Sequence, residues 1–263
     1  MSLDTSISSN GAAGTVLSRR RFGRVLGAST LGMTLTACAG DAQESAEPAA
    51  DTQTPPPGPM APTQDQASQA AMTPDRALSM LREGNARYVA GSPARRDLAA
   101  QIQATAGGQY PFAIVLGCVD SRVPIEVVFD QGIGDIFAAR VAGNIVNGDL
   151  LGSMEFACRL AGSKAVVVLG HTACGAVKGA ISNAELGNLT GLVQKIEPAV
   201  VAVEGERDTD NAAYVDQVAE TNVRMVLDEI REQSPVLAEM EQDGSIAIVG
   251  AMYDISTGEV RFL

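Results

Sequence analysis

The sequence predicts an α/β protein with a central, mainly parallel β-sheet flanked by helices, preceded by an N-terminal helical arm. Two observations carry this prediction. Continuous apolar runs at 112–117, 165–169 and 246–252 have the length and composition of strands buried on both faces. Segments with helical spacing separate these runs. Such alternation is typical of a parallel sheet covered by helices on both sides.

The first elements form the arm. Thr73-Pro74-Asp75 supplies an N-cap, a proline at the first helical position and an acid in the first turn. Leu78, Leu81 and Tyr88 follow at helical spacing. A second short helix is expected at about 94–104, before the strand at 112–117.

Strands and helices alternate through the rest of the chain. A second strand is expected at 136–141, and Asp149 is expected to cap a helix whose inward-facing residues are Leu150, Phe156, Ala157 and Leu160. After the strand at 165–169, the pattern predicts helices at about 175–183, 189–203, 211–232 and 235–242. The strand at 246–252 follows, and residues 259–263 are expected to pair at an edge of the sheet.

The N-terminal third divides into two further segments. Residues 1–37 are interpreted as a twin-arginine export signal, because Ser18-Arg19-Arg20-Arg21-Phe22 precedes a short, mildly apolar stretch. Residues 38–72, rich in Pro, Ala and Gln, are interpreted as a disordered tether, because they contain almost no large apolar side chains. The catalytic domain is then expected to span residues 73–263.

Cleavage of the signal has two interpretations. Leu35-Thr36-Ala37-Cys38 matches a lipobox, which makes Cys38 the lipidated first residue of the mature chain. Ala37-Cys38-Ala39 also fits an ordinary small-x-small cleavage site. The mature protein is therefore expected to be periplasmic or a membrane-anchored lipoprotein.

Charge and cysteine content restrict the partners. A net charge of −12 argues against nucleic acid or an anionic membrane surface as a binding partner. Four widely and irregularly spaced cysteines do not resemble a disulfide framework. Cys158, on the inner face of a predicted helix, is interpreted as a small core residue.

The only histidine, His171, and two cysteines form a candidate ligand set. Cys118 and His171 each follow or end an apolar strand, and Cys174 lies three residues beyond His171. Because ligands gather at the carboxyl ends of parallel strands, these side chains are expected to meet there. Cys and His are the preferred ligands of zinc, and three of them leave one position for water. The competing interpretation is a disulfide between Cys118 and Cys174.

Asp120 and Arg122 supply a candidate dyad beside the ligands. Two thiolates cancel the charge of Zn²⁺, so its bound water needs help to ionise near neutral pH. Asp120 can accept the hydrogen bond that orients the hydroxide, and Arg122 can hold Asp120 ionised through a bidentate pair. Two alternatives remain: a purely structural ion pair, or Asp120 as a fourth zinc ligand when Arg122 releases it.

Together, these motifs resemble the paired signature of the β-class carbonic anhydrases. The resemblance rests on Cys118-Val119-Asp120-Ser121-Arg122 and His171-Thr172-Ala173-Cys174-Gly175, and it extends through 129–132, 140–144 and 152–155. It implies that Cys118, His171 and Cys174 bind one Zn²⁺ per subunit. It also implies that Asp120 and Arg122 are catalytic in the reversible hydration of CO2 to bicarbonate through zinc-bound hydroxide. The protein is then expected to be a homodimer or tetramer.

Further expectations concern the pocket. Gly175 is expected to open a helix near the metal and leave room for substrate, and Gln131 to donate a hydrogen bond into the pocket. Some relatives bind regulatory bicarbonate with a tryptophan, which this chain lacks. Two other functions remain open: hydrolysis of carbonyl sulfide or carbon disulfide on the same fold, and non-catalytic binding of zinc or bicarbonate.

Overall fold

The computed structural model describes residues 60–263. The predicted export signal at 1–37, the lipidation site Cys38 and the first part of the predicted tether, 38–59, lie outside the described residues. Within 60–263, no helix is both long enough and apolar enough to cross a bilayer.

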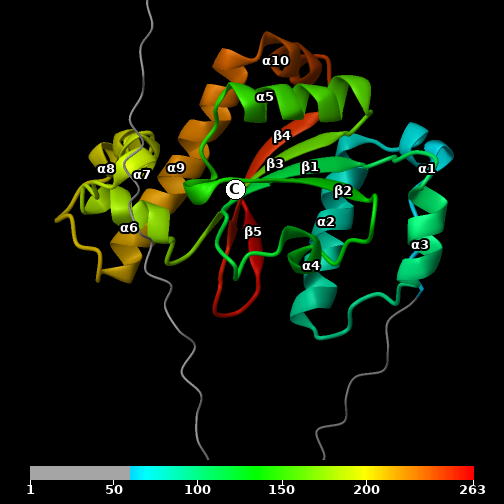
Figure 1. The fold of residues 1–263 in the computed structure, drawn as a ribbon, viewed down its shortest axis with the longest axis horizontal. Coiled ribbons are helices and arrows are strands. Elements are labelled where there is room, and N and C mark those ends of the chain that lie inside the picture. The colour runs from blue at the N-terminus through cyan, green and yellow to red at the C-terminus, as the bar shows by residue number, and fades with distance from the viewer. Residues whose placement is uncertain (1–59) are drawn as a thin grey trace, which may run out of the picture. The chain divides into compact units, whose positions relative to one another are not determined.

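A five-stranded sheet forms the centre of the fold, in the order β2-β1-β3-β4-β5 (Figure 1). The strands are β1 (Ala113–Gly117), β2 (Ile136–Arg140), β3 (Ala165–His171), β4 (Ala247–Tyr253) and β5 (Val260–Phe262). The first four are parallel, and β5 pairs antiparallel with β4. The predicted α/β class with a mainly parallel sheet is therefore confirmed.

Ten α-helices surround this sheet in the described residues. They are α1 (Gln66–Ala70), α2 (Pro74–Val89), α3 (Leu98–Thr105), α4 (Ile125–Val128), α5 (Gly148–Glu155), α6 (Gly175–Ile181), α7 (Gly187–Val193), α8 (Glu197–Ala202), α9 (Ala212–Gln233) and α10 (Pro235–Gln242). A 3₁₀ turn at Ala142–Asn144 and a π turn at Phe156–Leu160 complete the list.

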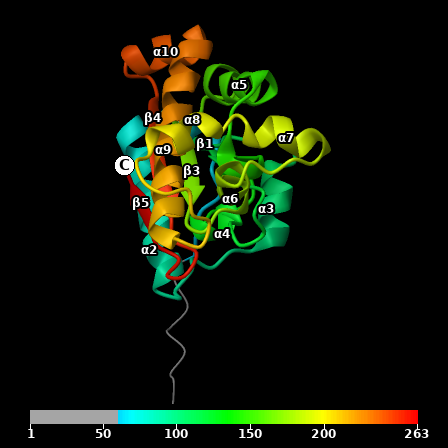
Figure 2. The ribbon, with the colours of Figure 1, turned by 90° about the vertical axis from the view of Figure 1, so that its left-hand side faces the viewer.

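Two hydrophobic cores lie on opposite faces of the sheet. Along β1, Ile114 and Leu116 belong to the core with α5, α9 and α10, whereas Ala113 and Val115 belong to the core with α2 and α4. Figures 1 and 2 show the corresponding layers of helices above and below the strands. Because successive side chains of a strand point to opposite faces, continuous apolar runs are what a doubly covered sheet requires.

The helix after β2 differs from the prediction. Asn147 is its N-cap and accepts a hydrogen bond from the amide of Leu150, while Asp149 lies in the first turn; the prediction of Asp149 as the cap was wrong. Ala157 faces inward as predicted, but Phe156 is 48% exposed and Leu160 77% exposed. Phe156 lines a surface groove with Phe137 and Leu150. The π turn at 156–160 adds about one residue to a helical turn, which rotates Leu160 away from the predicted face.

Two other segments also differ from the prediction. The single helix predicted at 189–203 is two helices, because Pro198 lacks an amide hydrogen and starts α8 instead of continuing α7. Residues 60–72, assigned by composition to the tether, include α1, whose Gln69 side chain donates hydrogen bonds to the carbonyls of Pro111 and Ala161. These bonds fix the segment to the domain although it buries little apolar surface.

A buried carboxylate joins the arm to the sheet domain. Asp130 follows α4, and its side chain accepts hydrogen bonds from the amide of Ala94 and from Arg87 and Arg96. Burial alone would raise the pKa of Asp130, but these hydrogen bonds outweigh burial and lower the pKa. The ionised carboxylate therefore holds the connection between α2 and α3 against the domain.

Candidate metal centre

The three predicted ligands converge at the carboxyl ends of two neighbouring strands. Cys118 directly follows β1, His171 ends β3, and Cys174 is the N-cap residue of α6. Their sulfur and ring nitrogen atoms all lie within 4.8 Å of one another, and each residue is at least 97% buried. All three cysteines in the described part of the chain (Cys118, Cys158 and Cys174) are free thiols, so the alternative of a Cys118–Cys174 disulfide is not adopted.

The imidazole of His171 is oriented for a ligand. Its Nδ1 lies 2.9 Å from the carbonyl oxygen of Thr172, an acceptor that places the ring hydrogen on Nδ1. The other nitrogen, Nε2, is buried and has no hydrogen-bond partner among residues 60–263. A buried nitrogen lone pair without a donor is costly unless something fills the position, and a metal ion does so. The donor set therefore fits zinc.

The two ligand sulfurs differ in how readily each loses its proton. The neighbouring Cys174 thiol lowers the pKa of Cys118 against the opposing effect of burial, while the pKa of Cys174 is raised by Cys118 and by burial. The amide of Gly143 donates a hydrogen bond to the Cys118 sulfur at 3.3 Å, which further favours a thiolate there. Cys118 and Cys174 therefore share one proton, which a divalent metal ion displaces when it binds.

Asp120 and Arg122 form the bidentate pair that the sequence suggested. Arg122 donates from Nε to Asp120 Oδ1 at 3.0 Å and from Nη2 to Oδ2 at 2.7 Å, and its own amide donates to Oδ1 at 2.9 Å. These hydrogen bonds from Arg122 hold the pKa of Asp120 well below its usual range, although burial opposes them. The carboxylate is therefore ionised whenever the protein is folded at neutral pH.

Arg140 fixes the backbone that carries this pair. From the end of β2, it donates to the carbonyl oxygens of Cys118 at 2.8 Å and Asp120 at 2.5 Å. Because β2 and β1 are paired at Gly117 and Arg140, this side chain reaches the first ligand loop from the neighbouring strand. The sequence placed 140–144 within the family resemblance but did not indicate these acceptors.

The two predicted substrate-pocket residues lie in different places. Gly175 is exposed at the start of α6, and a Cβ atom added there would meet nothing within 4 Å, so the space beside Cys174 is open. Gln131 instead donates to the carbonyl of Phe129 at 2.6 Å and lines a cavity of about 210 Å³ beside Arg96 and Asp130. No metal ligand lines that cavity. Substrate binding by either residue stays a prediction.

Three residues with contacts to the ligand loops were missed by the sequence analysis. Gly143 has φ +68°, and an added Cβ would lie 2.5 Å from Ile196 Cδ1, so the loop that donates to Cys118 needs glycine. Asp216 on α9 accepts a hydrogen bond from the amide of Ala173 in the second ligand loop, and Asn222 on α9 donates to the carbonyl of Gly143. Asn222 carried a signal, because it is a polar residue on the apolar stripe formed by Val215, Val218, Ala219, Val223 and Val226.

Comparisons with known proteins agree with this geometry. A sequence model of the carbonic anhydrase family matches residues 113–260. Carbonic anhydrase 2 of Mycobacterium tuberculosis is 37% identical over 191 residues, covering 70% of this chain and 90% of the relative. The structure of the β-carbonic anhydrase CafA of Aspergillus fumigatus is 29% identical with a TM-score of 0.56, covering 72% of this chain and 89% of that one.

A third similarity concerns the fold alone. One of the structures of two tetrameric β-carbonic anhydrases from Sordaria macrospora is 24% identical with a TM-score of 0.54, covering 63% of this chain and 90% of that one. The family match spans both ligand loops and the Asp120–Arg122 pair, and the matching relatives are covered over most of their length. This chain belongs to the β-class carbonic anhydrase family.

Proposed function

We propose that this protein is a zinc-dependent carbonic anhydrase that interconverts CO2 with bicarbonate and a proton. One observation carries the proposal: a buried Cys118–His171–Cys174 cluster lies on the same loop system as an ionised, bidentate Asp120–Arg122 pair. Zinc, when bound by these three residues, supplies an acidic water molecule and a positive centre for the developing bicarbonate. The side chains around the cluster orient the nucleophile and control its protonation.

The hydrogen bonds of Asp120 leave one acceptor position free, and this position defines its role in the reaction. A carboxylate offers about four acceptor positions, and three of them receive Arg122. The remaining position on Oδ2 is available to accept a proton-bearing oxygen and to orient its lone pair toward CO2. Arg122 keeps Asp120 from accepting the proton itself, so Asp120 positions the nucleophile rather than acting as its base.

The proton must leave without an imidazole shuttle. His171 is the only histidine in the chain and belongs to the ligand cluster. Proton release therefore passes through water, buffer or a carboxylate, and turnover should rise with buffer concentration until another step limits it. Stopped-flow measurements at several buffer concentrations test this expectation; a rate independent of buffer from the lowest concentration would contradict it.

Replacing Asp120 with asparagine tests the proposal directly. Asp120→Asn keeps the shape but removes the charge and one acceptor, so the CO2 hydration rate should fall by about 10²-fold or more while zinc content stays near one per subunit. Asp243→Asn, at the exposed end of α10, is the matched control and should leave the rate unchanged.

Two results would contradict the carbonic anhydrase proposal. Zinc-loaded protein that hydrates CO2 no faster than buffer would favour a non-catalytic zinc protein. An Asp120→Asn variant with full activity would instead contradict the catalytic role of Asp120. Faster turnover of carbonyl sulfide than of CO2 on the same preparation would favour the hydrolase alternative.

A homodimer, or a tetramer built from it, is part of the proposal. The outer edge of β2 is unpaired in the described residues, and beside it lies an apolar groove of about 750 Å³. Phe137, Leu150 and the 48%-exposed Phe156 line this groove. Exposed strand edges with apolar neighbours favour pairing with a second chain, and a fungal protein of the same fold is described as tetrameric. Light scattering should give a mass of two or four chains; a monomer at micromolar concentration would contradict this.

Export completes the proposal. The twin arginine at 19–21 and the lipobox ending at Cys38 support passage through the twin-arginine route followed by lipidation. Mass spectrometry of the mature N-terminus should find a lipid-modified Cys38. An unmodified N-terminus, or retention of the first 37 residues, would contradict it.

A further inference from the structure

Helix α9 packs against β3, which ends at His171, and against the 3₁₀ turn at Ala142–Asn144. It is the longest helix described, and its Val215, Val218 and Val223 are almost fully buried in the core with β3. Two polar side chains on this helix bond to its surroundings near the ligands: Asp216 to the loop between His171 and Cys174, and Asn222 to the 3₁₀ turn at Ala142–Asn144. They are six residues apart, which separates them by about 9 Å along the helix axis.

Asn222 acts on the loop beside Cys118. It is 2% exposed, and its Nδ2 donates to the carbonyl oxygen of Gly143 at 3.0 Å. The amide of the same Gly143 donates to the Cys118 sulfur. Asn222 therefore fixes a residue whose backbone serves the first ligand directly, and the left-handed conformation of Gly143 is held from its carbonyl side.

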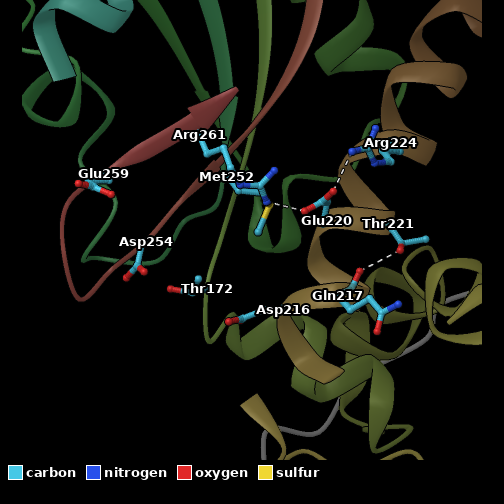
Figure 3. Close-up of a pocket in the computed structure, with 10 residues that line it drawn as sticks. All are labelled: Thr172, Asp216, Gln217, Glu220, Thr221, Arg224, Met252, Asp254, Glu259 and Arg261. Atoms are coloured by element: carbon cyan, nitrogen blue, oxygen red, sulfur yellow. Dashed lines mark hydrogen bonds and ion pairs between the residues drawn. The ribbon is translucent and has the colours of Figure 1, made fainter. Parts of the chain in front are cut away.

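Asp216 acts on the loop between His171 and Cys174. Its Oδ1 accepts a hydrogen bond from the amide of Ala173 at 2.9 Å. Ala173 has φ +52°, a left-handed conformation that is unfavourable for a residue with a Cβ and must be held by its surroundings. Figure 3 shows the Asp216 carboxylate pointing toward the segment that carries Thr172, and both residues line a cleft of about 570 Å³.

The other side of this loop is held by β4 and the turn after it. The amide of Thr172 donates to the carbonyl of Tyr253, and the Thr172 hydroxyl accepts from the amide of Ile255. The carbonyl of Thr172 in turn orients His171. The conformation that points His171 and Cys174 at one centre thus has two supports, the β4–β5 turn and Asp216.

We propose that Asp216 and Asn222 are positioning residues for the zinc site: Asp216 holds the loop between His171 and Cys174, and Asn222 holds the Gly143 turn that donates to the Cys118 sulfur. The proposal rests on the proposed zinc-dependent function and adds that two hydrogen bonds from this helix support the ligand geometry. Loss of either hydrogen bond lets one loop relax away from the ligand geometry. Residues that orient metal ligands typically contribute about 10- to 100-fold in metal affinity.

The test is zinc affinity by chelator competition, with the visible spectrum of the Co²⁺-substituted protein as a second readout. Asp216→Ala should weaken zinc binding about 10- to 100-fold and shift the cobalt bands. Asp216→Asn retains an oxygen acceptor for Ala173 and should stay within about threefold of wild type. Asn222→Asp places a carboxylate against the carbonyl of Gly143 and should weaken zinc binding at least as much as Asp216→Ala. Gln217→Ala, an exposed neighbour on the same cleft, is the control.

The outcomes separate positioning from general stability. If Asp216→Ala lowers only the melting temperature of the apoprotein, with wild-type zinc affinity and cobalt spectrum, the proposal is overturned. Asp216 is only half-buried, so its two variants carry the test even if Asn222→Asp does not fold. A wild-type chain that binds no zinc overturns this inference together with the proposed function, whereas tight zinc binding without CO2 hydration overturns only the function.

Discussion

Replacing Cys174 with alanine should weaken zinc binding by about 10²- to 10³-fold and abolish CO2 hydration at ordinary zinc concentrations. Apparent zinc-binding free energies of about 10–16 kcal/mol, shared among three protein ligands and one water, give about 2.5–4 kcal/mol for each ligand, which corresponds to that loss. The remaining Cys118 and His171 would bind the ion with two open positions. Metal content after dialysis and hydration rate on the same preparation measure the effect.

Cys158 offers a matched control for this substitution. It is as deeply buried as Cys174, but it lies in the π turn away from the ligand cluster, and burial raises the pKa of its thiol to about 12. It therefore stays protonated and packs as an apolar residue. Cys158→Ala should keep zinc and activity and cost only stability. Equal zinc loss in both variants would show that the cluster is not the binding site.

The ligand cluster was predictable because the carboxyl ends of neighbouring parallel strands lie at the same edge of the sheet. Cys118 and His171 lie about fifty residues apart in the chain, yet each comes at the carboxyl end of an apolar run, and β1 pairs directly with β3. The positions of Asp120 and Arg122 beside the cluster followed from the loop that begins at Cys118, because side chains two residues apart in one loop can contact each other. Those inferences needed only strand positions and local spacing.

What could not be predicted depends on contacts between distant segments. Asn222 bonds to Gly143 across 79 residues, and Asp216 to Ala173 across 43, so no local pattern specifies either bond. The prediction for the helix after β2 was wrong for a different reason. Asn147 and Asp149 are both good N-cap residues, and the π turn that follows changed which side chains face the core.

Replacing Gly84 with alanine should lower the free energy of unfolding by about 3 kcal/mol or more, because the added methyl group has no space. Gly84 lies in α2 where the helix passes α4, and a Cβ built there would be 1.8 Å from the carbonyl oxygen of Phe129. That oxygen belongs to the backbone and also accepts the hydrogen bond from Gln131, so it cannot move as the end of a side chain does. Equilibrium urea unfolding measures the loss.

A second glycine shows why the effect should come from contact rather than from helix propensity. Gly191 is exposed in α7, and an added Cβ would meet nothing within 4 Å, so Gly191→Ala should stabilise the protein by about 0.5–1 kcal/mol. The same gain applies to α2, which means that the measured loss at Gly84 understates the steric cost by that amount. If Gly84→Ala were as stable as wild type, α2 and α4 could not approach as closely as described. The packing that joins the N-terminal arm to the sheet through Phe129 and Asp130 would then need another explanation.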